Sequence, residues 1–268
     1  MVLSSNNIPD SKGINAYYRD KSFAKLLEYY CGKELFEQVE NKFIELGEIV
    51  GSELEELALS ADKNPPQLKK RSRIGALSND IEKHPDFIKI EKIAFEKFGL
   101  AAMSHRHGIF GLQQPLPPII KYGLTFLFVQ SEFGICCPLS MTDSLTRTLR
   151  KFGDEKLIEK FFDQLTSQDL DHLFQGAMFM TEQHAGSDVG SIDTFAEFED
   201  GNWFLTGDKW FCSNPDADLA MVLARHDKEK SGTKGLALFL LPKKLENGDP
   251  NNYEIIRLKD KLGGRSFA

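Results

Sequence analysis

The sequence predicts an α+β chain, with an all-α bundle in residues 1–172 and an antiparallel β-barrel or sandwich domain in residues 173–268. Three observations predict this division. Apolar residues recur at helical spacing through the first two-thirds of the chain. Near residue 173 the period changes from 3.6 to two. The strands that follow are short and joined by turns with no helix between them, as in antiparallel sandwiches and barrels.

The helical part is divided by glycine and proline. A first helix is expected to end at Cys31-Gly32, and a long amphipathic helix to run from Lys33 to about Ser60. After a break at Asn64-Pro65-Pro66, the basic residues 69–73 are expected to lie in a loop, as solvated surface or, less often, as a phosphate contact. Further helices are predicted over Phe87–His105, over Asp143–Lys151 and over Asp154–Leu165. Another is expected to open at Pro115 to Pro118, to carry the apolar face Ile119–Phe128 and to end at Gly134 and Pro138. His105 and His107 are interpreted as ordinary polar residues, because their spacing does not put both rings on one helical face.

The β domain is predicted from alternation and turn signals. Asp200-Gly201 is a strong hairpin turn. The predicted strands are Leu173–Thr181, Ile192–Phe198, Trp203–Leu205, Leu219–Arg225, Gly235–Leu241 and Tyr253–Leu258.

Composition excludes several classes of protein. The 268 residues carry a net charge of −7, which disfavours broad nonspecific binding of nucleic acid. The four cysteines form no C-x-x-C pair, so a reduced, cytoplasmic protein without a metal site is expected. Residues 1–10 are polar and lack the apolar core of a signal peptide, and no apolar run approaches membrane-spanning length.

Three short blocks carry a resemblance to a known family. The first runs from Met178 to Gly190 and includes Met180-Thr181-Glu182 followed by Gly186-Ser187-Asp188. It resembles the M-T-E-x-x-x-G-S-D signature of acyl-CoA dehydrogenases, which are FAD enzymes. Residues 205–214 and 260–266 resemble two further family blocks, in the same order. Lys209-Trp210-Phe211, with Ser213, looks closest to the AidB-like branch.

The resemblance implies a reaction and its partners. In the family a carboxylate removes the α-proton of an acyl-CoA thioester, and the β-hydrogen leaves as hydride to flavin N5. The resemblance further implies an electron-accepting flavoprotein and a homo-oligomer. The family's C-terminal helical bundle, which carries the catalytic glutamate, has no counterpart in the 268 residues. The chain is therefore expected to be an N-terminal fragment that is inactive alone, and no catalytic residue is assigned.

The resemblance also implies roles for five residues. Thr181 would hydrogen-bond the pyrimidine end of the flavin, and Met180 would offer its backbone to the same edge. Ser187 would meet the FAD pyrophosphate and also contact substrate. Phe211 stands where the family has a tryptophan against the ring, and Ser213 where it has a threonine near N5.

Each of these assignments has a plainer alternative. The hydroxyls of Thr181 and Ser213 could be ordinary strand or turn groups, and Phe211 could be core. Glu182 and Asp188 are interpreted as acceptors that fix the loop, since the family does not use these positions as its base.

Two other functions stay open for the parent protein. AidB-like proteins are associated with the response to DNA alkylation, and nucleic-acid binding has been attributed to their C-terminal region, which this sequence does not show. A non-catalytic acyl-CoA binder is the other alternative, with the apolar helix Ile119–Val129 as a pocket wall or, more commonly, as core.

Overall fold

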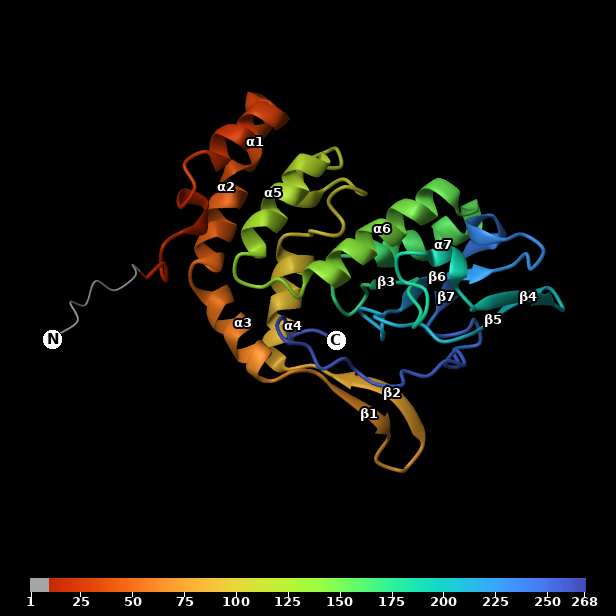
Figure 1. The fold of residues 1–268 in the computed structure, drawn as a ribbon. Helices are drawn as coiled ribbons and strands as arrows, with labels where there is room; N and C mark the ends of the chain where they lie inside the picture. Colours follow the sequence, from red (N-terminus) through yellow and green to blue (C-terminus); the bar gives the residue numbers. More distant parts are fainter. Residues whose placement is uncertain (1–9) are drawn as a thin grey trace.

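The computed structural model describes residues 10–268. The predicted absence of a signal peptide concerns residues 1–10, of which 1–9 lie outside the described part. Helices form the first two-thirds of the described chain and a five-stranded sheet lies in the last third, which confirms the α+β fold class (Figure 1). No helix within residues 10–268 has both the length and the apolar character needed to span a bilayer.

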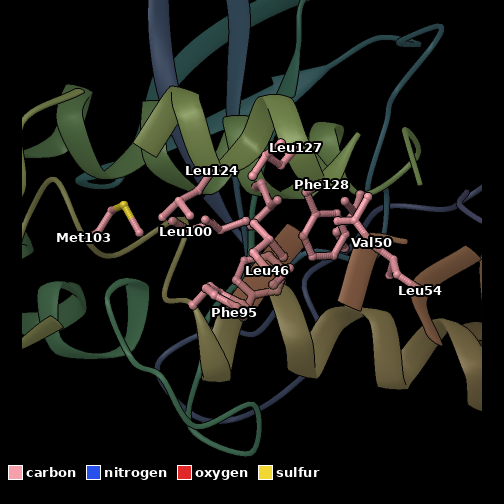
Figure 2. Packing of buried hydrophobic residues seen from close by; sticks show 14 of the residues in the cluster. Leu46, Val50, Leu54, Phe95, Leu100, Met103, Leu124, Leu127 and Phe128 are labelled. Atoms are coloured by element: carbon pink, nitrogen blue, oxygen red, sulfur yellow. The ribbon is translucent and has the colours of Figure 1, made fainter. Parts of the chain in front are cut away.

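The helices pack around one large apolar core. Leu46 and Val50 of α2 and Phe128 of α5 are almost fully buried there, and Figure 2 shows them converging with Phe95. Burial on this scale is the main stabilising term of the helical part. The helices are α1 (Phe23–Cys31), α2 (Lys33–Val50), α3 (Glu53–Lys63), α4 (Pro85–Glu91) followed by a π-helix (Lys92–Lys97), α5 (Pro118–Phe128), α6 (Cys136–Phe152) and α7 (Glu155–Leu165).

The predicted long helix Lys33–Ser60 is wrong, because the chain breaks into α2 and α3 at Gly51-Ser52. The N-terminal loop packs against this break. A Cβ at Gly51 would lie 2.1 Å from the carbonyl oxygen of Ile14, and Gly51 O accepts a 2.7 Å hydrogen bond from Gly13 N. Only glycine allows that approach, and the contact comes from outside the helix.

The predicted helix Phe87–His105 is also wrong in its extent. It begins at Pro85, widens into the π-helix and ends before Gly99, whose φ of +56° is left-handed. Helix α6 starts at Cys136, so Pro138 lies in the first turn of α6 instead of marking the exit of the preceding helix.

The basic residues near position 70 lie in a strand and not in a loop. Strands β1 (Gln67–Arg71) and β2 (Leu77–Glu82) form an antiparallel hairpin that projects from the body of the molecule (Figure 1). Lys69 pairs with Glu82 and Lys70 with Glu254, so two of the four cations are already matched by carboxylates. Strand alternation is weak here because both faces are largely solvated.

The sheet is mixed, which corrects the expectation of a wholly antiparallel arrangement. Strand β6 pairs parallel with β3 and antiparallel with β7, and joins β4 in parallel at Phe195 and Arg225. The connection from β3 to β6 includes the β4–β5 hairpin and is long enough to return the chain in the same direction. The strands are β3 (Gly176–Phe179), β4 (Phe195–Glu199), β5 (Asn202–Thr206), β6 (Leu219–Arg225) and β7 (Leu236–Pro242).

The turn between β4 and β5 confirms the hairpin prediction. Asp200 and Gly201 both have positive φ, +48° and +82°, as the tight turn between twisted strands requires. Helices α6 and α7 pack on the sheet (Figure 1), with Leu145 and Leu149 of α6 against Leu219 and Met221 of β6. Helix α6 also caps the start of β3, because Thr142 Oγ1 accepts a 2.9 Å hydrogen bond from Gly176 N.

The predicted strand Tyr253–Leu258 is not formed. The segment is extended, but its backbone bonds go to a side chain instead of a strand: Ile255 N donates to Asn79 Oδ1 (2.9 Å), and Asn79 Nδ2 donates to Tyr253 O (2.7 Å). The segment thereby runs along the β1–β2 hairpin and back toward α4 (Figure 1).

Candidate functional site

The first two sequence blocks meet directly after strands β3 and β5. Trp210 N donates a 2.8 Å hydrogen bond to Thr181 O. The Lys209 ammonium donates to Met180 O (3.2 Å) and to Glu182 Oε1 (2.6 Å). The structure therefore brings Met180 and Thr181 alongside the residues that lead into Phe211.

The Glu182 carboxylate closes the base of the loop that follows. It accepts hydrogen bonds from Asp193 N (2.6 Å), Thr194 N (3.0 Å), the Thr194 hydroxyl and Lys209. Burial alone would raise the pKa of Glu182, but the bonds from Lys209 and Thr194 outweigh it and hold that pKa below the ordinary value. A carboxylate with this many donors is a structural anion and is poorly suited to accept a substrate proton.

Asp188 fixes the tip of the same loop. Its carboxylate accepts from Gly190 N (3.0 Å) and from Ser191 Oγ (2.5 Å). The interpretation of Glu182 and Asp188 as loop-fixing acceptors is confirmed.

The loop offers unpaired donors around Ser187. Among residues 10–268, the backbone amides of Gly186, Ser187 and Asp188 and the Ser187 hydroxyl have no acceptor. These residues are exposed, and a Cβ at Gly186 would touch nothing within 4 Å. Successive free amides beside a hydroxyl suit an anionic oxygen such as that of a phosphate.

The two other predicted hydroxyls are also unengaged. Within the described chain, Thr181 Oγ1 and Ser213 Oγ form no hydrogen bond, although both residues are half-buried. A half-buried hydroxyl without a protein partner is available to a ligand. Each of these hydroxyls can donate to or accept from a polar atom of a ligand.

Phe211 is held out of the core by its backbone. Its φ is +55°, and its side chain is 64% exposed, so the alternative that it is a core residue is wrong. The Lys259 ammonium lies 4.6 Å from its ring centroid. A bulky residue in the left-handed region is strained, and such strain is common at ligand sites. The exposed ring fits stacking with a planar ligand.

Asn214, at the end of the second block, and Ser266, in the third block, hydrogen-bond to residues outside their blocks. Asn214 is buried, with φ of +56°, and its side-chain amide donates to Gln175 Oε1 (3.1 Å) and Gly176 O (3.2 Å) at the start of β3. In the third block, Ser266 Oγ donates to the buried carboxylate of Glu132 at 2.7 Å. These three hydrogen bonds hold the second and third blocks against the rest of the molecule.

Sequence reasoning missed three residues that shape this site. Lys209 and Asn214 lie inside the second block, residues 205–214, but no role was predicted for them. Arg225 was interpreted only as the end of a strand. The signal for Lys209 was available, since a lysine flanked by Gly207-Asp208 and Trp210 is the only cation of that block. Arg225 donates to Gly190 O at 2.6 Å, a contact that no local pattern indicates.

His105 proves to be a buried structural residue, which corrects its interpretation as ordinary polar. Its Nε2 lies 2.8 Å from Asp143 Oδ1, while Lys121 donates to the other oxygen at 2.6 Å. Arg150 donates to His105 Nδ1 at 3.3 Å. This polar cluster ties α5 and α6 together within the helical part.

Comparison with known proteins agrees with the two-part organisation. Residues 6–172 match the family model described as the adaptive response protein AidB N-terminal domain. Residues 177–268 match the model described as the acyl-CoA dehydrogenase middle domain.

Individual relatives are similar over most of this chain. Acyl-CoA dehydrogenase family member 11 of Caenorhabditis elegans is 30% identical over 262 residues, which is 94% of this chain and 42% of the relative. Putative acyl-CoA dehydrogenase AidB of Escherichia coli is 32% identical over 231 residues, or 80% of this chain and 39% of the relative. The chain thus spans well under half the length of these relatives.

A solved structure shows the same fold. The crystal structure of Caenorhabditis elegans ACDH-11 in complex with C11-CoA superposes with a TM-score of 0.83 at 28% identity, over 98% of this chain and 45% of that one.

Proposed function

Because the chain belongs to the acyl-CoA dehydrogenase family, in its AidB-like branch, we propose that it provides the flavin-binding part of an FAD-dependent oxidoreductase. The proposed reaction is α,β-desaturation of an acyl-CoA thioester. Bound FAD would supply the hydride acceptor, at flavin N5. The observation that carries the proposal is the set of unengaged donors, Thr181, Ser187 and Ser213, on loops that Glu182 and Lys209 fix together.

Each proposed site residue has a part that its surroundings permit. Thr181 and the Met180 backbone would hold the polar edge of the flavin. Phe211 would stack against its ring, and the Ser213 hydroxyl would bond near N5. These donors are placed before the ligand arrives, because Lys209 and Trp210 already hold the two segments together.

Ser187 would bind phosphate oxygens, with the amides of Gly186 and Asp188 beside it. The proposal covers the pyrophosphate of FAD and a contact to substrate. A loop with three free amides lowers the free energy of a bound anion without requiring a lysine or arginine in contact with it.

Proton abstraction is assigned to none of residues 10–268. Glu182 and Asp188, the carboxylates of this loop, are occupied by backbone and side-chain donors. We further propose domain limits of 1–172 and 173–268, which the matched ranges 6–172 and 177–268 support.

For the whole protein we propose acyl-CoA as substrate, an electron-accepting flavoprotein as partner, a homo-oligomeric assembly and a cytoplasmic location. The four cysteines, which form no disulfide, are consistent with a reducing compartment. Desaturation activity by residues 1–268 alone is not part of the proposal.

A second candidate is an acyl-CoA binder that does not turn its ligand over. The structurally similar ACDH-11 was solved with C11-CoA, which favours acyl-CoA as a ligand class. Titration of the full-length protein with acyl-CoAs of increasing chain length separates the two, since binding without bleaching of the flavin supports sequestration.

The test of the proposed function is a visible absorbance spectrum after incubation with FAD and removal of free flavin. A retained band with a shifted maximum is expected. A protein that elutes colourless would contradict the proposed flavin site.

A further inference from the structure

Arg225 stands where three parts of the β domain meet. It is the last residue of β6, and its backbone N donates a 2.8 Å hydrogen bond to Thr194 O just before β4. Thr194 is also the residue whose amide and hydroxyl bind Glu182. The backbone of Arg225 is therefore anchored beside the base of the Ser187 loop.

All three hydrogen bonds of the Arg225 guanidinium go to backbone carbonyls. Nη2 donates to Gly190 O at 2.6 Å, and Nη1 donates to Lys230 O at 2.9 Å and to Gly232 O at 3.3 Å. No acidic side chain of residues 10–268 forms an ion pair with it. The side chain thus joins the Ser187 loop to the turn 226–235 and places a positive charge beside that loop.

The two joined segments are in direct backbone contact. A Cβ at Gly190 would lie 3.1 Å from Gly232 Cα, and a Cβ at Gly235 would lie 2.7 Å from Arg225 Nη1. Gly232 itself has a φ of +62°. Glycines at these positions let the chain close around the guanidinium.

We propose that Arg225 is a positioning residue that fixes the Ser187 loop for a nucleotide pyrophosphate, that of FAD or of CoA. This inference rests on the proposed function. Arg225 acts through Gly190: by holding that carbonyl it sets the tip of the loop that presents the free amides of Gly186, Ser187 and Asp188. Its positive charge also favours an anion on the loop.

The geometry requires arginine specifically. A lysine keeps the charge, but a single ammonium on a flexible stem cannot hold three carbonyls in a fixed fork. Arg225→Lys therefore separates positioning from charge, and Arg225→Met removes both. Arg147, an exposed residue of α6 with no hydrogen bond or ion pair among residues 10–268, provides the matched control Arg147→Lys.

The experiment compares four ligands on the purified chain by equilibrium titration. FAD and CoA carry the pyrophosphate, while riboflavin and pantetheine lack it. In Arg225→Lys, the affinity for whichever of FAD and CoA the wild type binds is expected to fall about tenfold, because charge-assisted hydrogen bonds are lost. Affinity for riboflavin or pantetheine is expected to stay the same, which a general loss of folding would not give.

A ligand-free measurement accompanies the titration. Amide hydrogen exchange over residues 186–192 is expected to speed up in Arg225→Lys and to stay unchanged in Arg147→Lys. The positioning role would be overturned if wild type and Arg225→Lys showed the same amide exchange, or if the variant bound FAD and CoA with the wild-type affinities. Either result would leave the flavin site intact. A wild-type chain that binds neither FAD nor CoA would instead refute the proposed function, and the ligand assignment with it.

Discussion

Lys209 Nζ lies 2.6 Å from Glu182 Oε1, and both side chains are more than nine-tenths buried, at 7% and 8% exposure. The pair joins two loops that are 27 residues apart in the chain. It has excellent geometry, because Glu182 also receives two amides and a hydroxyl, and Lys209 reaches a carbonyl as well. Buried pairs satisfied in this way are strongly destabilised when one partner is removed.

Removing one member of this pair is expected to be costly. Lys209→Met leaves the Glu182 carboxylate buried without its cation, so the free energy of unfolding should fall by about 3–5 kcal/mol. Urea denaturation followed by circular dichroism measures it. Lys228→Met, which breaks an exposed pair with Glu197, is the control and should cost about 0–1 kcal/mol. If both variants lost the same free energy of unfolding, burial of the Lys209–Glu182 pair would add nothing to its stabilising effect.

The Asp143 cluster is expected to make the helical part acid-sensitive. Burial opposes ionisation, but hydrogen bonds from His105 and Lys121 hold the pKa of Asp143 below its ordinary value. Because the folded pKa is depressed, this stabilisation is present above the unfolded value of about 4 and is lost as the pH falls through the folded pKa.

The check is a pH series of unfolding free energies for wild type and Asp143→Asn. The variant should be less stable at neutral pH, and its stability should fall less steeply below pH ~4. Parallel acid limbs for the two proteins would contradict the role of Asp143.

The Thr181 hydroxyl should matter for ligand and not for folding. It has no partner among residues 10–268, so Thr181→Ala should change the free energy of unfolding by no more than about 0.5 kcal/mol. If the hydroxyl bonds the flavin, FAD affinity should fall about tenfold, the value of one hydrogen bond. Thr181→Ser keeps the hydroxyl and should restore affinity. A Thr181→Ala variant that binds FAD as wild type would remove Thr181 from the site.

Gly207 is expected to tolerate no side chain. Its φ is +151°, and a Cβ there would lie 2.7 Å from Thr194 Cα, next to the Glu182 contact. Gly207→Ala should therefore lower the free energy of unfolding by about 1–3 kcal/mol. Gly186→Ala is the matched control, because open space surrounds it. Thermal melting compares the two, and a smaller loss at Gly207 than at Gly186 would contradict the packing argument.

Much of the fold was predictable where a pattern is local. The strand Leu219–Arg225 has the predicted bounds because its residues are apolar and bounded by turn signals. The Asp200-Gly201 turn was predictable because few other dipeptides adopt two successive positive φ values. The hairpin β1–β2 was not predicted because both of its faces are largely exposed to solvent, so its sequence does not alternate between apolar and polar residues.

The candidate site was predictable only as a set of residue types. Its motif named Thr181, Ser187, Phe211 and Ser213, but the residues that hold them in place were found only in three dimensions. Asn79 shows the same limit in the fold: its side chain binds the segment 253–255, 174 and 176 residues away, and takes the place of the strand partner that the sequence predicted.

By itself the sequence determined the division into a helical part and a β part, the strand Leu219–Arg225, the Asp200-Gly201 turn and the positions of the three blocks, because each depends on neighbours within about one helical turn or one hairpin. Only the tertiary structure decided which carboxylate Lys209 meets, which carbonyls Arg225 holds, that β3 runs parallel to β6, and that His105 is buried. Those outcomes depend on the path of the whole chain, since the free energy of a buried polar group is set by partners distant in sequence.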